Sequence, residues 1–508
     1  MRRLALGVGV ATLSCSAAPA QEASGADGGS VTTGNSGSAS SGPSPTSGVT
    51  PGSSGNPEPG SSSTSAPGSS STGQSTSTEG SSTSTGDAAA EYCPPTLSDA
   101  VLPWREAYDV HFANTDSMRS ALGSLPSGSG HWGQTYTLRS LVLMYELTGE
   151  LAYLHELMWQ ANTLADLAGD DATWPTGVCG NTFSHSTVVI DGRFLTPLLR
   201  AAWWMQNSRL ADDEVPSIDG LDFEGATYGD IAESYAALAT EVLASHEGDR
   251  ISIASESFGP ESGNPSLYYR FPNSYTCVAS DVMPFNYANS AGTAYAELWH
   301  LTGDADARTQ AEELLTFWWN RTYAYEPSPG STRSRWYGYR GELGERFNPD
   351  DDTHRAEDIG HADMTSSFAD RMFTFGLGSL NATRMDQVAM ASKRWVDRVL
   401  STDDAPSYAI TNDDHDGEWR DLFDHLPMSC YRGSILEDLT ALAPIELAND
   451  DGSYPRAVIE NLAEFAYYTE YADSVSPCGP TCGDGVCGGA EDCVGCPADC
   501  ECPSGQCD

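Results

Sequence analysis

A repeated pair of amphipathic helices is the feature that most constrains how this 508-residue chain can fold. Apolar residues recur at helical spacing over 134–147 and 151–168, and the short joint Thr148-Gly149-Glu150 links these two segments. The same joint returns as Thr302-Gly303-Asp304. The other predicted pairs are 191–206 with 228–245, 286–301 with 305–319, 361–377 with 384–400, and 431–447 with 454–471, and one more helix is predicted near 97–113. No stretch has the pattern of a block of strands, so the pattern predicts an all-α fold.

Helical hairpins that cannot bury an apolar face alone must stack on their neighbours, as a solenoid or as a closed ring. Joints within the pairs are mostly short, whereas long segments follow the second helix of four pairs. If the pairs stack in register, these long segments emerge on one rim. They cover 169–190, 247–283, 320–360 and 401–430. Because they are rich in Trp, Tyr, Asn and His, we expect functional loops at that rim.

The N-terminal part has a different character. Arg2 and Arg3 precede an apolar stretch within residues 1–20, which is the layout of a secretory signal peptide. Two processing sites remain open: a small-x-small site at Ala18-Pro19-Ala20, or a lipobox-like sequence ending at Cys15, which would then carry a lipid anchor. Residues 21–91 are mainly Ser, Gly, Thr and Pro and predict a disordered linker. The sequence therefore predicts an exported protein, extracellular or on a bacterial outer-membrane surface, with no transmembrane helix in the mature chain.

Cysteine usage agrees with export. Apart from Cys15, four cysteines lie in the helical region and eight in the tail 477–508, and an even number in an exported chain favours disulfides. The four are Cys93, Cys179, Cys277 and Cys430. The tail resembles a short Cys-rich repeat of bacterial exported proteins, for which we expect a separate disulfide-rich module in contact with the cell surface. A zinc site at the Cys493-x-x-Cys496 spacing is the competing interpretation.

The net charge of -46 makes nucleic acid an improbable partner, because such a surface repels a phosphate backbone.

Residues 97–472 resemble the (α/α) toroid polysaccharide lyases and the related six-hairpin glycosidase-like proteins. The resemblance rests on the Leu-Thr-Gly-Glu/Asp turns, on Pro284-Phe285-Asn286-Tyr287, and on the sequence from Glu357 to Ala362 at the head of a helix. It implies a toroid of about five to six helical hairpins over 92–476 and a polysaccharide substrate.

The resemblance also implies a lyase chemistry. Elimination from a uronate-containing glycan requires a group that neutralises the carboxylate, a base for the C5 proton and an acid for the leaving oxygen. Toroid lyases use Asn, His, Tyr and Arg for these tasks, and the matching positions are Asn286, His361, Tyr337 and Arg340. The rim residues expected to bind the glycan are Trp336, Tyr339, Trp174, His185, Tyr269, Arg270 and Trp419.

Two alternatives stay open. A glycoside hydrolase needs two carboxyl groups, for which Glu357, Asp358 or Asp363 with Asp414 are candidates. The same rim would also suit a surface protein that binds glycan without cleaving it.

No cofactor is required for either chemistry. Asn412, Asp414 and Asp416 have the spacing of oxygen ligands in a calcium loop, which makes a structural Ca²⁺ a candidate. Phe423 stands where an EF-hand has its bidentate Glu, so an EF-hand is not expected.

Overall fold

The computed structural model describes residues 97–114, 118–119, 122, 128–167, 175–176, 185–272, 281–325, 334–336, 359–401, 419–449 and 455–471, all within one compact unit. The predicted signal peptide, the linker and the Cys-rich tail lie outside these residues. Cys430 lies within the described residues and is disulfide-bonded. All other cysteines of the chain lie outside the described residues.

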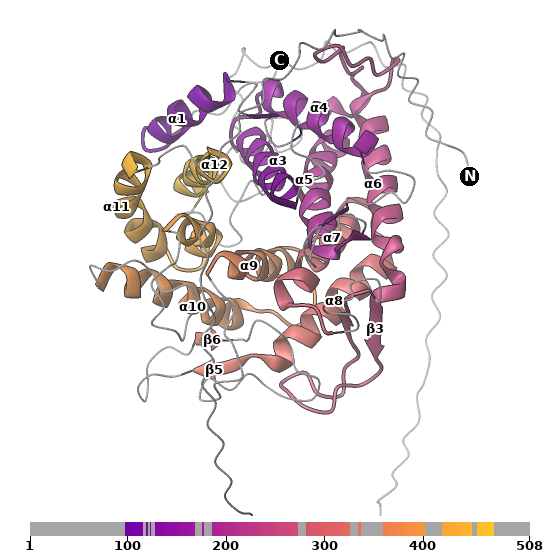
Figure 1. The fold of residues 1–508 in the computed structure, drawn as a ribbon, viewed down its shortest axis with the longest axis vertical. Coiled ribbons are helices and arrows are strands. Elements are labelled where there is room, and N and C mark those ends of the chain that lie inside the picture. Colours follow the sequence, from indigo (N-terminus) through magenta and orange to yellow (C-terminus); the bar gives the residue numbers. More distant parts are fainter. Residues whose placement is uncertain are drawn as a thin grey trace, which may run out of the picture. The chain divides into compact units, whose positions relative to one another are not determined.

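The described residues form an inner ring of six helical elements (Figure 1). They are α3 (Gly128–Thr148), α5 (Val188–Asn207), α7 (Phe285–Thr302), α9 (Ile359–Thr374), the 3-10 helix η4 (Trp419–Cys430) and α12 (Pro455–Tyr471). Each element packs against the next, and α12 packs against α3. The ring is therefore closed, which decides between the solenoid and the toroid.

A second layer of helices surrounds this ring. Its members are α4 (Leu151–Leu167), α6 (Tyr228–Ser245), α8 (Ala305–Arg321), α10 (Ala382–Ser401), α11 (Ser434–Asn449) and α1 (Leu102–Phe112). The first five follow their inner partners in the chain, while α1 packs against α12 from the opposite end of the sequence. The predicted all-α toroid is thus confirmed.

One predicted hairpin was wrong. The sequence paired 431–447 with 454–471, but α11 is the outer partner of η4, and α12 is the inner partner of α1. The segment 401–430, expected to be a rim loop, contains η4. This element has 3-10 geometry and includes Pro427, and a proline interrupts the hydrogen-bonding pattern of an α-helix.

The repeated Thr-Gly-acid joint has a local explanation. Gly303 adopts φ 73°, a left-handed conformation that ends α7, and Asp304 then caps α8 by accepting from the backbone N–H groups of Asp306 and Ala307. The Thr302 hydroxyl donates to the Leu298 carbonyl and accepts from the Asp304 N–H. These contacts close the turn in three residues.

Short strands occur only as ribbons in the part of the chain that is described. The antiparallel pairs are β1 (Pro175–Thr176) with β2 (His185–Ser186), β3 (Arg250–Ile253) with β4 (Ser266–Tyr269), and β5 (Tyr323–Tyr325) with β6 (Ser334–Trp336). All three lie in connections from an outer helix to the next inner helix. Two further 3-10 turns are η2 (Arg209–Asp212) and η3 (Glu247–Asp249).

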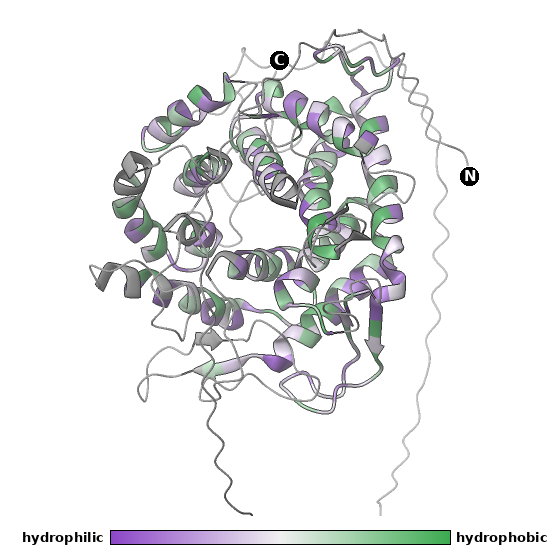
Figure 2. Ribbon diagram, viewed as in Figure 1, coloured by the Kyte–Doolittle hydropathy of each residue, from purple (hydrophilic) through white to green (hydrophobic). Residues whose placement is uncertain are grey.

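The inner helices pack closely because small residues face their neighbours. A Cβ built on Gly192 of α5 would lie 2.5 Å from the Ser290 backbone carbon of α7, and one on Gly292 of α7 would lie 2.5 Å from the Phe368 ring of α9. Figure 2 shows hydrophobic and hydrophilic residues interspersed along the helices of the ring. None of the described helices is long and apolar enough to span a bilayer.

Candidate active site

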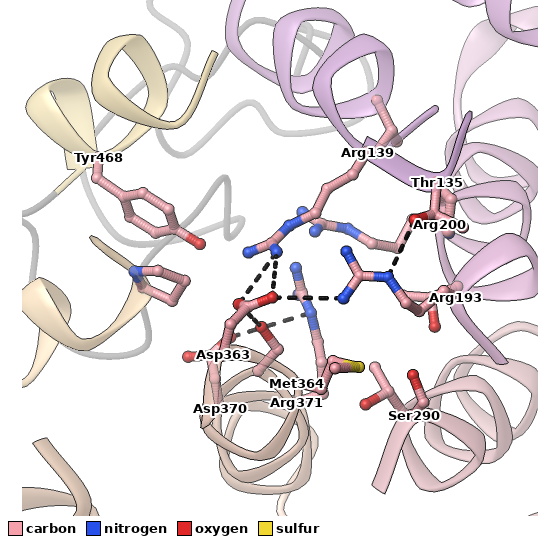
Figure 3. A pocket seen from close by; sticks show the side chains of 16 residues that line it. Thr135, Arg139, Arg193, Arg200, Ser290, Asp363, Met364, Asp370, Arg371 and Tyr468 are labelled. Atoms are coloured by element: carbon pink, nitrogen blue, oxygen red, sulfur yellow. Dashed lines mark hydrogen bonds and ion pairs between the residues drawn. The ribbon is translucent and has the colours of Figure 1, made fainter. Parts of the chain in front are cut away.

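A cavity of about 60 Å³ lies between the inner helices (Figure 3). Its lining combines charged and small polar side chains and comes mainly from α3, α5, α7, α9 and α12. The lining residues that carry charge are Arg139, Arg193, Arg200, Asp363, Asp370 and Arg371. A volume of this size admits a few water molecules or one small substituent of a larger ligand.

The inner elements all run in the same direction, because inner and outer elements alternate along the chain from α3 to α12. Their N-terminal ends therefore share one rim, where the long connections enter. Asp363 is the fifth residue of α9, and Asp370 lies two turns deeper. Charged residues at these two depths form two layers across the ring axis.

The upper layer comprises Arg139, Arg193, Asp363, Glu460 and Glu464. Arg139 Nη1 donates to both carboxylate oxygens of Asp363, at 3.1 and 3.2 Å, and lies 3.3 Å from Glu460. The other terminal nitrogen, Nη2, forms an ion pair with Glu464 at 2.5 Å. Arg193 Nη1 lies 3.6 Å from Asp363 on the other side. Figure 3 shows both guanidinium groups directed at this carboxylate.

The lower layer comprises Glu146, Arg200, Glu297, Asp370 and Arg371. Arg200 binds Glu146 through two nitrogens, with Nε at 3.1 Å, and Arg371 Nε lies 3.2 Å from Glu297. Asp370 accepts a hydrogen bond of 2.6 Å from the hydroxyl of Tyr431.

Among the described residues, each layer holds two arginines and three carboxyl groups, so full ionisation would leave one excess negative charge in a buried place. Burial opposes that charge. It raises the pKa of Glu460 and of Glu297 to about 7, raises the pKa of Glu464 well above its ordinary value, and also raises the pKa of Asp370. Each layer therefore retains protons near neutral pH and comes close to electroneutrality.

Two carboxyl groups of the cavity stand on one face of α9. Seven residues separate Asp363 from Asp370, which is two turns and about 10 Å along the helix axis. That spacing is far beyond the roughly 5 to 5.5 Å of a nucleophile and acid pair in retaining glycosidases. It is closer to the roughly 6.5 to 9.5 Å separation of the pair that flanks a water molecule in inverting enzymes.

The predicted lyase residues do not meet in this cavity. His361, on the first turn of α9, is half-buried with its ring edge-on to Trp132 at 6.4 Å, and it does not line the cavity. Asn286 is fully buried on the first turn of α7 and is not a lining residue either. Neither residue lines the described cavity, and their convergence on one site stays a prediction.

Two predicted glycan-binding residues also lie away from this cavity. Tyr269 is 1% exposed, and its hydroxyl pairs with that of Tyr295 at 3.2 Å, so its ring cannot stack on a sugar. Arg270 donates to the Tyr268 hydroxyl at 3.0 Å, and neither residue lines the cavity. Tyr269 is the last residue of β4, whose packing against α8 buries it, while Arg270 follows β4 and is half-buried.

Most of the remaining predicted residues lie outside the described part of the chain. Tyr337, Arg340, Tyr339, Trp174, Glu357 and Asp358, and the calcium candidates Asn412, Asp414 and Asp416, lie outside the described residues. The backbones of His185, Trp336 and Trp419 belong to β2, β6 and η4, while their side chains are outside the description. Within the described ranges, no three His, Cys, Asp or Glu side chains are grouped to hold a metal ion.

No family model and no curated protein matches the chain. Among solved structures, the chain is similar to two inactive variants of the alpha-1,6-mannanase GH76A of Salegentibacter sp. HEL1_6, one in complex with alpha-1,6-mannotetrose and the other with alpha-1,6-mannotriose. The identities are 10% and 11% and the TM-scores 0.38 and 0.39, over 66% of this chain and 89% of each of those chains. A likeness at this level says nothing about the activity of this chain.

Proposed function

We propose that this protein hydrolyses a glycan at the ring axis, with Asp363 and Asp370 as its pair of carboxyl groups. The observation that carries the proposal is that both groups line one cavity from the same face of α9. Burial raises the pKa of Asp370, whereas Asp363 is held by two guanidinium groups. Pairs of carboxyl groups in such contrasting environments are typical of acid and base roles.

In this mechanism, protonated Asp370 donates its proton to the glycosidic oxygen as the bond to the anomeric carbon breaks. Asp363 accepts a proton from a water molecule, whose oxygen attacks the anomeric carbon from the opposite side. The products are a new reducing end and the released alcohol, with inverted configuration. Ser367, which donates to Asp363 Oδ1 at 3.1 Å, and Arg139 keep the carboxylate in place.

The charge balance favours a neutral glycan over a uronate. Every arginine of the two layers has a carboxyl partner, and protons retained by the acids bring each layer close to zero charge. A uronate carboxylate would therefore find little unbalanced positive charge in the cavity. The cavity can hold only part of a sugar, so the rest of the glycan would lie outside it.

The test is incubation with a panel of neutral and uronate-containing polysaccharides, recording both reducing ends and the absorbance of unsaturated products. Hydrolysis of a neutral glycan produces reducing ends without unsaturation. Asp363→Asn and Asp370→Asn should each reduce turnover by about two to four orders of magnitude with the fold intact. Asp397→Asn, an exposed change on the outer helix α10, is the matched control and should retain full activity.

Three outcomes would contradict this proposal. Unsaturated products would restore the lyase. Undiminished turnover in both cavity variants would place the chemistry elsewhere on the molecule. Binding of a glycan by the unmodified protein without any turnover would indicate a binding protein.

A further inference from the structure

We infer that Tyr431 is a positioning residue that orients Asp370 through the hydrogen bond from its hydroxyl, an inference that rests on the proposed function. Tyr431 follows η4 directly and lies across from α9, with its ring edge-on to Phe373 at 5.6 Å. Its backbone is held by a hydrogen bond from its N–H to the Met428 carbonyl at 3.2 Å. The hydroxyl therefore approaches Asp370 from a fixed direction.

The contact has the geometry of a strong hydrogen bond. The distance of 2.6 Å between the hydroxyl and Asp370 Oδ1 lies in the range of charge-assisted O–H···O bonds. The nearest guanidinium atom, Arg371 Nε, is 4.0 Å from Asp370, too far for a hydrogen bond, and it lies closer to Glu297. Among the described residues, Tyr431 is thus the neutral side chain that donates directly to this carboxyl group.

Other groups act on Asp370 through charge alone. They are Arg371 on α9, Arg200 on α5, Arg139 on α3, Glu297 on α7 and Tyr468 on α12. Burial raises the pKa of Asp370, and the arginines and the Tyr431 hydroxyl lower it again. The hydroxyl can donate to an ionised carboxylate, so it stabilises the charged form. Removing the hydroxyl should let Asp370 keep its proton to higher pH.

This leads to a specific change in the pH profile. An acid catalyst must be protonated, so it controls the alkaline limb of the profile of kcat. In Tyr431→Phe, that limb should move to higher pH by about 1 to 2 units, because hydrogen bonds to charged groups have this strength. The acid limb should stay where it is. KM should change little, since Tyr431 does not line the cavity.

Tyr153→Phe is the matched control. The Tyr153 hydroxyl also donates to an aspartate, Asp109, but this pair joins α4 to α1 on the outer layer and is remote from the cavity. It should leave both limbs of the profile unchanged. A uniform loss of kcat at all pH values in Tyr431→Phe, or an alkaline limb that does not move, would reduce Tyr431 to a packing role and overturn the inference.

A second measurement does not depend on activity. Carbon-13 NMR of the aspartate carboxyl groups, with the Asp370 resonance assigned from Asp370→Asn, should show a higher midpoint of titration in Tyr431→Phe than in the unmodified protein. If no polysaccharide is cleaved but this midpoint moves, the proposed function fails while the coupling of Tyr431 to Asp370 stands. An unchanged midpoint rejects the coupling itself.

Discussion

Single buried carboxyl groups at the ring axis make the free energy of unfolding depend on pH. Glu297 is 2% exposed, and burial raises its pKa to about 7, although Arg371 lowers it in part. In the unfolded chain the same group loses its proton near its ordinary pKa of 4.5. Between these values the folded protein binds more protons than the unfolded chain, so the free energy of unfolding falls as the pH rises from about 4.5 to about 7.

The variant Glu297→Gln tests this dependence. The amide cannot ionise, so the variant should lose a part of the pH slope that is worth on the order of 3 kcal/mol across this window. Urea unfolding at pH 5 and pH 7 measures the difference. Glu460 contributes in the same direction, so a smaller slope should remain. Glu233→Gln, an exposed change on α6, should keep the full slope, and an equal slope in Glu297→Gln would show that this group is ionised throughout.

Of the two carboxyl groups in the proposed site, one was a candidate from the sequence and the other was not. Asp363 was among the candidate hydrolase carboxyl groups, because it follows His361 at the head of a predicted inner helix. Asp370 was missed, since nothing in one helix shows which residues across the ring will surround it. Asn286 and Tyr269 were expected at the rim from their order in the chain, but order does not reveal depth, and both are buried by neighbouring elements.

At the scale of the elements, the charged residues at the ring axis recur at a regular spacing in the sequence. Arg139 and Glu146 on α3 are seven residues apart, as are Arg193 and Arg200 on α5 and Asp363 and Asp370 on α9. Seven residues are about two helical turns, so each pair lies on one stripe of its helix. The repeat indicates a charged seam, but which arginine meets which acid depends on the ring, and a periodic pattern cannot specify that.

Close packing of α5 against α7 yields a prediction for Gly192. Glycine to alanine within a helix usually stabilises by up to about 1 kcal/mol. Here the new Cβ would lie 2.5 Å from the Ser290 backbone, so Gly192→Ala should instead destabilise by about 2 to 4 kcal/mol. Denaturant unfolding measures the change. Gly248→Ala in η3, where no atom lies within 4 Å of the added Cβ, should stay within about 0.5 kcal/mol, and similar small effects in both variants would mean that α5 and α7 separate easily.

At the scale of the whole described unit, the ring closes by contacts between the first and the last described segments of the chain. The Ser98 backbone N–H donates to Glu470 at 3.2 Å, across 372 residues of sequence, and α12 packs on both α1 and α3. The helix spacing predicted that hairpins stack, but it could not decide whether the last one meets the first. That decision depends on contacts between residues that no local pattern connects.

Trp104 on α1 tests this closure. Its ring stacks on Phe465 of α12, with centroids 4.6 Å apart and planes inclined by 18°, and Phe465 in turn contacts Phe423 of η4. Trp104→Ala should lower the free energy of unfolding by about 2 to 4 kcal/mol, through lost aromatic contact and burial. Val110→Ala is a control on the same helix, where the side chain is 72% exposed and the change should have little effect.

The shape of the transition separates a closed ring from an open stack. In an open solenoid, a change in a terminal element weakens its neighbours most, and the remaining repeats can unfold separately. In a closed ring every inner element has two inner neighbours. The stability lost at the contact of α1 with α12 should therefore be shared by all inner elements. Calorimetry of Trp104→Ala should therefore give one transition, shifted to lower temperature. Two separate transitions would indicate that α1 and α12 unfold on their own and that closure contributes little to the stability of the rest.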